Sequence, residues 1–379
     1  MLVLAVVLLV GEGAAQVVDP LVPGWHGLDN GSVIMVGHPT RLWGLGPGER
    51  RNGTHTAHIA EVGLRSPVPE VPRPPGRARI LVLGDSTFFG HDLDDADAIP
   101  VQLGELLREQ GVDADTVNGA VPGYSTEQSR RLLDDMGWDR QPTLLAIGNL
   151  WSDNNFDHFH DADLLHTREV YLNHPLARSA LFRVTAAVVD KLRGGDAARV
   201  VTWTRDSAWP SVGVRRVPLA TYARNLDAMI RAAAARGIGA ALVSPCNVRM
   251  ARGLTAQGNV WDAYYRVQAD VARHHGIPII RTEAAMRVAA QQVDAESLYV
   301  DDMHPTATGA RVMAAAIAAG LLEARWPARA LRGRTEPFDA SAVRDDNPEG
   351  LPEIPTARSP QTNLFPHTAA ATRGQVMAP

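Results

Sequence analysis

Candidate strands alternate with candidate helices through the middle of the chain. Short apolar runs bounded by turn residues predict buried strands, and five candidates lie at residues 78–84, 115–123, 142–148, 238–245 and 277–282. Apolar positions at helical spacing predict helices at residues 98–111, 125–137, 221–237, 261–276 and 306–324. Because repeated strand and helix units with buried strands form parallel sheets covered on both faces, we predict an α/β fold, a three-layer α/β/α sandwich.

The rest of the chain divides around this core. We predict a signal-like segment at 1–16, an irregular or short-stranded region at 17–77 ending in a Pro-rich connector, a main domain at 78–326 with an insertion at about 150–219, and a tail at 327–379. An insertion of this length is more often a lid or a substrate-binding excursion than a plain connection. The tail is rich in Pro, Thr, Ala and Arg and lacks the apolar residues to fold alone, so we expect it to be disordered.

Composition places the chain among globular proteins, with 45% hydrophobic and 21% charged residues over 379 positions. Its 37 basic and 42 acidic residues are interspersed and give a formal net charge of -5, so we expect no nucleic-acid partner. Cys246 is the only cysteine, which excludes an internal disulfide and a cysteine-based metal cluster. The His and Asp residues at 157–166 have metal-ligating chemistry. Loop clusters of this kind are commonly solvated, and we predict neither a metal nor a cofactor.

Ser86 stands directly after the first predicted strand, in the run Gly84-Asp85-Ser86. In open α/β sheets ligands bind at the carboxyl ends of the strands. A serine needs a base to become a nucleophile, and Asp301 and His304 form a D-x-x-H arrangement just before the last predicted helix. This spacing lets the carboxylate reach Nδ1 of the imidazole and leaves Nε2 free to take the serine proton. We therefore predict a catalytic triad of Ser86, His304 and Asp301.

Two further stretches follow predicted strands and offer hydrogen-bond donors. Gly123 follows the second strand, where a backbone N–H without a side chain beside it can approach a ligand. Asn149 follows Gly148 at the end of the third strand, and Asn154 lies slightly further on. Each has an ordinary explanation as a turn or cap residue, but their shared position at strand ends predicts an oxyanion hole. Its amide donor is Asn149 or Asn154, and we favour Asn154.

These residues together resemble the four sequence blocks of the SGNH hydrolases, also called GDSL esterases and lipases. The blocks are GDS at 84–86, Gly123 in VPGYS, an Asn in IGNLWSDNN, and Asp301 and His304 in DDMHP. The resemblance covers residues 78 to about 325 and implies a flavodoxin-like sandwich. It also implies Ser86 as nucleophile, His304 as general base, Asp301 as its orienting partner, and an oxyanion hole built from the Ser86 N–H, Gly123 and the third-block Asn.

The third block departs from the family's G-x-N-D pattern, because Gly148 is followed by Asn149-Leu150 and the SDNN match is displaced. Asn149 and Asn154 therefore both stay open. The lead-in HPTRLWGLGPG followed by GLR is similar to the N-terminal part of exported bacterial members.

The resemblance implies a serine esterase, and we expect its substrate to be an acyl ester, such as an acetyl ester, of a carbohydrate or another small molecule. Two alternatives stay open. One is an O-acyltransferase that uses the same triad but excludes water from the acyl-enzyme. The other is a catalytically inactive binding or assembly protein of the same fold, which the irregular third block suggests.

The first ten residues, MLVLAVVLLV, are apolar and are followed by the small residues Gly13 and Ala15, which suit a signal peptidase site. We expect an exported protein, whether periplasmic, membrane-associated or extracellular, whose mature chain begins near Gln16. Membrane contact is expected at most through this segment. No Lys or Arg precedes the apolar run, and a buried strand of the mature protein is the alternative.

Overall fold

The computed structural model describes residues 2–19, 35–157, 160–192, 214–254 and 261–344. A five-stranded parallel sheet lies at its centre, made of β5 (Ala78–Leu83), β6 (Ala114–Asn118), β7 (Leu144–Ile147), β10 (Gly239–Ser244) and β11 (Ile279–Arg281). The strands are ordered β6, β5, β7, β10 and β11, which is the order 2-1-3-4-5 along the chain. This order is the flavodoxin-like one, so the predicted sheet is confirmed.

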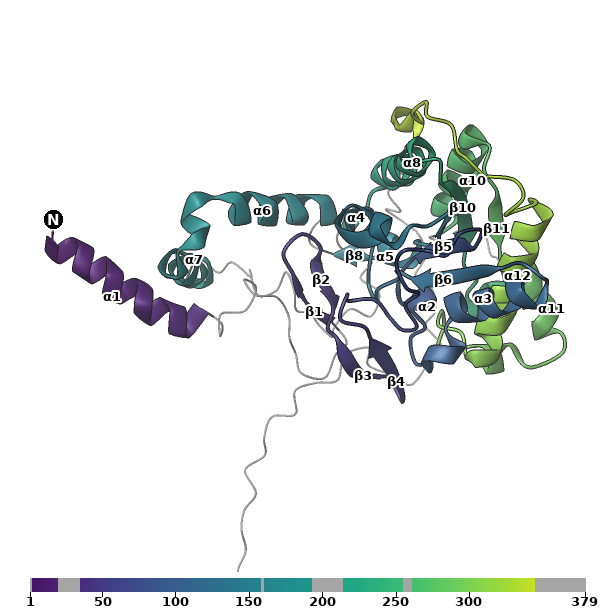
Figure 1. Ribbon diagram of the computed structural model, residues 1–379, viewed down its shortest axis with the longest axis horizontal. Coiled ribbons are helices and arrows are strands. Elements are labelled where there is room, and N and C mark those ends of the chain that lie inside the picture. Colours follow the sequence, from purple (N-terminus) through teal and green to yellow (C-terminus); the bar gives the residue numbers. More distant parts are fainter. Residues whose placement is uncertain (1, 20–34, 158–159, 193–213, 255–260, 345–379) are drawn as a thin grey trace, which may run out of the picture.

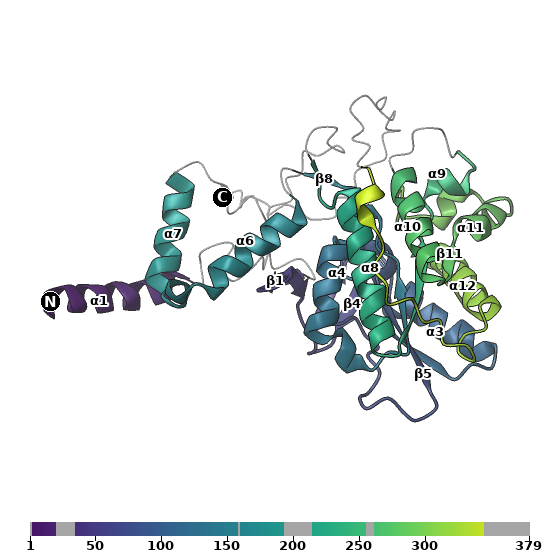
Figure 2. The same cartoon turned by 90° about the horizontal axis from the view of Figure 1, so that it is seen from above.

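Helices cover both faces of the sheet (Figures 1 and 2). On one face α3 (Ile99–Glu109) packs against α12 (Ala307–Glu323), which also contacts α11 (Glu283–Ala290). On the other face α8 (Leu219–Ala235) packs against both α4 (Thr126–Leu132) and α10 (Asp262–His275). The predicted three-layer sandwich is therefore confirmed.

Some helices differ from the predicted ones. The helix predicted at 125–137 is α-helical only to Leu132 and continues as a π-turn over Leu133–Gly137. Helix α11 was not predicted. The structure also has three short helices: α2 (Ser86–Phe89), α5 (Trp151–Asn154) and α9 (Val248–Ala251).

The strands β5, β6 and β7 end at one edge of the sheet. Leu83 of β5 pairs with Ile147 of β7, and Val82 pairs with Asn118 of β6. Because all three strands are parallel, the loops that follow them emerge side by side. This register places the segments that begin at residues 84, 119 and 148 on the same edge.

The described part of the N-terminal region forms two small antiparallel hairpins. Strand β1 (Met35–His38) pairs with β2 (Leu42–Leu45), and β3 (Gly48–Asn52) pairs with β4 (His55–Ile59). A bridge between Arg65 and Asn118 joins this region to the central sheet.

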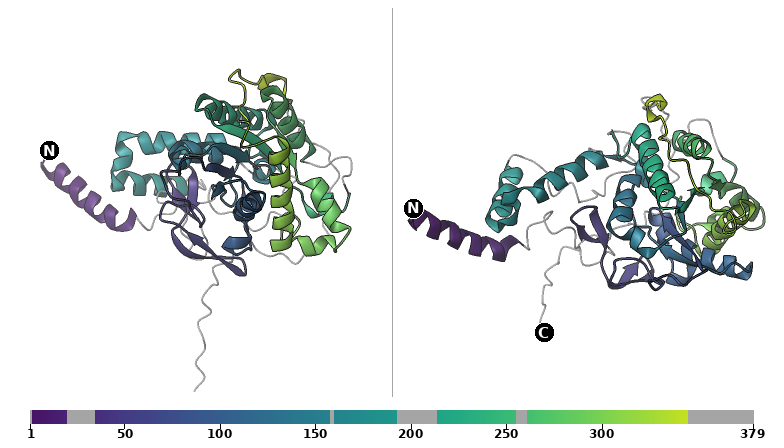
Figure 3. Two further views of the ribbon diagram at one scale, coloured as in Figure 1. Left: turned by 45° about the vertical axis from the view of Figure 1, so that its right-hand side comes forward. Right: turned by 45° about the horizontal axis from the view of Figure 1, so that its top comes forward.

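The insertion forms an arm that leaves the body of the molecule (Figures 1 and 3). A short pair of strands, β8 (Phe156–Asp157) and β9 (Val214–Arg215), lies at its base, and α6 (Asp161–Asn173) leads outward to α7 (Ala180–Leu192). At the far end α7 contacts α1 (Leu2–Val18). The N-terminal segment is thus helical with exposed apolar side chains, so its alternative interpretation as a buried strand is wrong. None of the helices in the described ranges is both long and apolar enough to cross a membrane.

The segment after α12 differs in part from the expected disordered tail. Trp326, Leu331 and Ala340 are buried, and Leu331 accepts a 2.8 Å hydrogen bond from the Ala240 N–H at the start of β10. Residues 327–344 therefore lie against the domain, because a few apolar anchors and main-chain hydrogen bonds hold a segment of otherwise polar composition. The remainder of the predicted tail, 345–379, falls outside the described residues.

Candidate active site

Ser86 is the first residue of α2, directly after the buried strand β5. The side chain of Asp85 caps this short helix by accepting a 3.1 Å hydrogen bond from the Thr87 N–H. Asp85 and Thr87 are fully buried, whereas Ser86 is partly exposed. The turn therefore presents the serine hydroxyl at the sheet edge while its neighbours anchor the backbone.

Close packing around Phe88 explains two glycines at this edge. A Cβ atom on Gly84 would lie 2.7 Å from the Phe88 ring, and one on Gly148 would lie 2.2 Å from it. Neither distance is tolerated by real side chains, so both positions require glycine. The ring of Phe88 thereby brings the end of β7 against the helix that carries Ser86.

His304 lies in the loop before α12, and its imidazole joins the serine to a carboxylate. Nε2 of His304 is 2.7 Å from Oγ of Ser86, and Nδ1 is 2.6 Å from Oδ2 of Asp301. When the neutral ring carries its proton on Nδ1, that N–H donates a hydrogen bond to the carboxylate and Nε2 can accept one from the serine hydroxyl. The structure thus brings Ser86, His304 and Asp301, which the sequence analysis singles out, into one hydrogen-bonded chain.

Asp301 is oriented by the backbone of its own loop. Its Oδ1 accepts hydrogen bonds from the N–H groups of Met303 (2.9 Å) and His304 (2.8 Å). Burial alone would raise the pKa of Asp301, but the charge and hydrogen bond of His304, with these two N–H donors, outweigh it and hold the pKa below its usual range. Asp301 therefore stays a carboxylate. Asp302, by contrast, has an exposed side chain.

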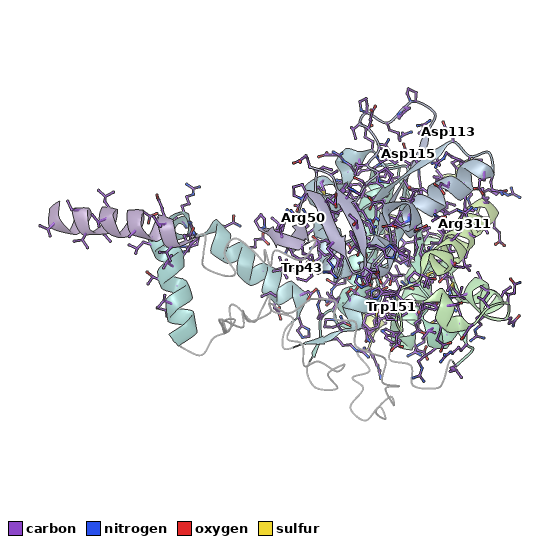
Figure 4. The ribbon with its side chains drawn as sticks, turned by 90° about the horizontal axis from the view of Figure 1, so that it is seen from below. Trp43, Arg50, Asp113, Asp115, Trp151 and Arg311 are labelled. Carbon is purple, nitrogen blue, oxygen red and sulfur yellow. The ribbon has the colours of Figure 1, made fainter. Side chains whose placement is uncertain are left out.

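Gly123 lies in the loop after β6 with φ at +77°, a left-handed backbone conformation that favours glycine. Its carbonyl accepts a 3.0 Å hydrogen bond from Arg216, and the preceding carbonyl of Pro122 accepts one of 3.0 Å from the indole of Trp43. Trp43 is labelled in Figure 4. The Val121 N–H donates to the carbonyl of Gly84 at 3.2 Å. The loop that carries Gly123 is thus fixed next to the turn that carries Ser86.

Asn149 and Asn154 are both buried, at 0% and 2% exposure. The Nδ2 of Asn149 donates to the carbonyl of Tyr124 at 3.2 Å, which ties the end of β7 to the loop of Gly123. Asn154 is the last residue of α5, and its amide oxygen has no hydrogen-bond partner within the described structure. The amide oxygen of Asn149 likewise has no hydrogen-bond partner within the described structure, so both residues remain candidates.

The segment around α5 is fastened to the serine turn and to α4. The Ser152 N–H donates to Oδ2 of Asp85 at 3.4 Å, and Oδ1 of Asp153 accepts from the Thr126 N–H at 2.9 Å. Asp153 is wholly buried, and burial raises its pKa to about 8. The third sequence block therefore folds back over the residue that precedes Ser86.

Two residues near the site were missed by the sequence analysis. Arg65, within the GLR run, is fully buried and donates to the carbonyls of Phe89, Gly90 and Leu93 at 2.6 to 2.7 Å. It therefore holds the carboxyl end of the helix that begins at Ser86. The run was noted for its resemblance, but nothing in its local pattern points to a contact so distant in sequence.

His91 lies beside the imidazole of His304, with the two ring centroids 4.6 Å apart at an interplanar angle of 53°. Burial and the neighbouring charge of His304 lower the pKa of His91 to about 4, so the ring is neutral at pH 7. Its position five residues after Ser86, just past a helix-ending glycine, is the one signal that could have indicated it.

The His and Asp cluster considered as a metal site has structural partners instead. Asp161 and Arg216 form a fully buried ion pair at 2.7 Å, and Asp161 also accepts from the Ser125 hydroxyl at 2.6 Å. His160 contacts the carbonyl of Arg215 at 2.8 Å. Across the described ranges no group of three or more His, Cys, Asp or Glu side chains is arranged to hold a metal; His158 lies outside those ranges.

The profile of the GDSL-like lipase/acylhydrolase family matches residues 82–312, more than half of the 379 residues. No match was found among curated proteins.

Solved structures give weaker likenesses. The lipase/acylhydrolase from Enterococcus faecalis is 15% identical with a TM-score of 0.41, over 69% of this chain and 100% of that one. Axe2, an acetylxylan esterase from Geobacillus stearothermophilus, is 15% identical with a TM-score of 0.41, over 65% and 93%. The esterase EstA from Pseudoalteromonas sp. is 14% identical with a TM-score of 0.40, over 65% and 98%. Residues 84–86 and 301–304 both fall inside the range that the family profile matches.

Proposed function

This chain belongs to the GDSL-like lipase/acylhydrolase family and is a carboxylic ester hydrolase, and from that premise we propose that Ser86, His304 and Asp301 carry its reaction. The substrate we propose is an acyl ester, such as an acetyl ester, of a carbohydrate or another small molecule. The observation that supports the assignment is the 2.7 Å approach of His304 Nε2 to Ser86 Oγ, with Asp301 on the other side of the ring.

In the first half of the reaction Oγ of Ser86 attacks the ester carbonyl while Nε2 of His304 takes its proton. Asp301 keeps the ring in the required tautomer and stabilises the imidazolium that forms. The tetrahedral intermediate then collapses, the carbon–oxygen bond to the alcohol breaks, and His304 returns the proton to the leaving alkoxide. An acyl-serine remains.

In the second half His304 takes a proton from water, and the hydroxyl attacks the acyl-serine. Collapse of this intermediate releases the carboxylic acid and returns the proton to Ser86. An acceptor alcohol in place of water would give acyl transfer by the same steps. Hydrolysis is proposed here because it requires no second binding site.

The oxyanion of each intermediate needs preorganised donors. We assign the N–H of Ser86, which lies in the first turn of α2 where helical acceptors are lacking, and the N–H of Gly123. The third donor is the amide of Asn154 or Asn149. The amide of Asn149 already donates to the carbonyl of Tyr124, which supports Asn154.

Turnover of a chromogenic acetyl ester tests this proposal. The wild type should release the chromophore and Ser86→Ala should not, with both proteins equally folded by circular dichroism. Acyl-chain preference follows from a series of longer esters, and acetylated oligosaccharides test the carbohydrate class. No release from any ester would favour the inactive binding protein, and acetate moved to an added sugar would favour the acyltransferase.

We also propose that the protein is exported, on the basis of its apolar N-terminal segment. Fractionation of cells that produce the full chain tests this directly. Recovery in the periplasm, membrane fraction or medium is expected, and recovery in the cytoplasm alone would contradict it.

A further inference from the structure

The arm ends in two helices, α1 and α7, that are fastened to each other by specific side chains. The carboxylate of Glu12 accepts hydrogen bonds from the Ser179 hydroxyl (2.6 Å) and from the N–H groups of Ala180 (2.8 Å) and Leu181 (3.1 Å). These bonds cap the first turn of α7, where helical acceptors are lacking. The hydrogen bond from Ser179, with those two N–H donors, lowers the pKa of Glu12 to about 2.

A second contact lies just after the end of α1, about two helical turns beyond Glu12. The guanidinium of Arg183 donates two hydrogen bonds to the carboxylate of Asp19, from Nε to Oδ1 at 2.9 Å and from a terminal nitrogen to Oδ2 at 2.5 Å. Asp19 is 4% exposed and Ala15, between the two contacts, is 6% exposed. Glu12 and Ala15 lie upstream of the cleavage point expected near Gln16. Removal at that point would take away the acceptor of the Ala180 and Leu181 N–H groups and leave only the Ser179 hydroxyl, which accepts from the Phe182 N–H at 3.2 Å, to cap α7.

In the opposite half of α1, which is apolar, five successive side chains are exposed. Val6, Val7, Leu8, Leu9 and Val10 are 50%, 60%, 51%, 72% and 67% exposed. Five successive residues pass through more than one full turn of a helix, and Figure 4 shows side chains projecting from several sides of α1. A protein partner docked on one side would leave the others in water, whereas lipid surrounds a helix completely. The exposure pattern therefore favours a lipid environment.

The charged residues on α1 and next to its junction with α7 are compatible with a lipid environment for the apolar half of α1. Glu12 is the only charged residue in α1, and its carboxylate is taken up by the cap of α7. Val188 and Val189 on α7 are also exposed, at 52% and 39%. Arg178, directly before Ser179 of the junction, is exposed, and a cation there suits an anionic headgroup.

We propose that α1 is retained in the mature protein and that its apolar half, residues 3–10, inserts into a lipid bilayer, so that the arm holds the hydrolase at a membrane surface. The contacts of Glu12 and Asp19 with the start of α7 would connect the inserted helix through α7 and α6 to the body of the molecule (Figures 1 and 2). The inference does not depend on the identity of the ester substrate.

Flotation with vesicles of phosphatidylcholine and phosphatidylglycerol tests the insertion. The full chain should float with the vesicles, and Leu8→Asp should lower the bound fraction by at least about tenfold, because an acidic side chain is costly among acyl chains. Val288→Asp is the matched control, since Val288 lies on α11 in the body and is 56% exposed, and it should float like the wild type. Unchanged esterase turnover in both variants would show that they fold.

Three results would contradict the insertion. The first is a wild type that stays with the unbound protein, and the second is a Leu8→Asp variant that floats as well as the wild type. The third is a vesicle-free dimer, seen by light scattering, that Leu8→Asp converts to a monomer, because the apolar half of α1 would then be covered by a second copy of the chain.

Mass spectrometry of the protein recovered from the membrane fraction tests retention separately. A mature chain that still contains Glu12 is expected. A chain that begins at Gln16 would show that the segment is removed and would overturn the proposal, whatever the vesicle result.

Discussion

Replacement of Asp301 by asparagine tests the orientation of the imidazole at the centre of the proposed mechanism. In the structure Oδ1 of Asp301 accepts from two backbone N–H groups, and Oδ2 accepts from Nδ1 of His304 at 2.6 Å. In Asp301→Asn the amide oxygen must take the place of Oδ1, because an NH₂ group there would face two donors. The NH₂ group is thereby turned toward Nδ1.

That orientation imposes the wrong tautomer on His304. An amide donor at Nδ1 requires that nitrogen to be unprotonated, so the proton moves to Nε2, which then cannot accept from Ser86. The same substitution in a serine-protease triad lowers kcat by roughly 10⁴-fold, which corresponds to about 5 kcal/mol of transition-state stabilisation. We expect a loss of that order here, with little change in the melting temperature.

Asp302→Asn is the matched control. The Asp302 side chain is exposed, and its backbone carbonyl, which accepts from Val248 at 3.0 Å, is untouched by the substitution. Its kcat should stay within about tenfold of the wild type, as expected for a residue outside the triad. Steady-state kinetics with a chromogenic acetyl ester compare the three proteins. If Asp301→Asn retained activity within tenfold, or if Asp302→Asn were the slower variant, the assignment of Asp301 would be wrong.

Three further predictions concern the surroundings of the triad. Of Asn149→Ala and Asn154→Ala, the variant that lacks the oxyanion donor should lose roughly 10² to 10³ in kcat with a smaller change in KM, and full activity in both would exclude an amide donor. The pKa of His91 is about 4 when folded and about 6.5 in an unfolded chain, so between these values the unfolded state binds more protons and the free energy of unfolding falls on acidification. His91→Phe should flatten that fall in urea titrations across this range, and an equally steep fall would contradict the lowered pKa of His91. Arg65→Met should lower the free energy of unfolding by about 3 to 5 kcal/mol, whereas Arg77→Met, at an exposed ion pair, should cost under about 1 kcal/mol; equal losses would refute the role given to Arg65.

The parts of the fold that rest on local pattern were predictable from the sequence. The buried strands β5, β7 and β10 are short apolar runs whose hydrophobicity fixes both their type and their burial. The D-x-x-H spacing restricts Asp301 and His304 to one loop, so their contact follows from the chain itself. Their approach to Ser86 follows from the parallel sheet, whose strand ends share one edge.

Contacts between distant segments were not predictable in the same way. Arg65 caps carbonyls more than twenty residues away, and Arg216 reaches Asp161 across the insertion, because a buried cation can be satisfied by any carbonyl or carboxylate that the fold brings near. Leu331 is held by a main-chain hydrogen bond, which leaves no trace in the side-chain pattern. Asn149 and Asn154 stayed ambiguous because both are buried in the segment that follows β7 and only the position of the substrate distinguishes them.

Covalent labelling of Ser86 is the most direct test of the account. A fluorophosphonate reacts with a serine whose hydroxyl is activated by a neighbouring base, so peptide mapping of the labelled wild type should find the adduct on Ser86. Ser86→Ala should take up no label and lose turnover by roughly 10⁴-fold or more, and His304→Ala should fail in the same way. Labelling at another serine, or undiminished ester hydrolysis by folded Ser86→Ala, would contradict the proposed mechanism.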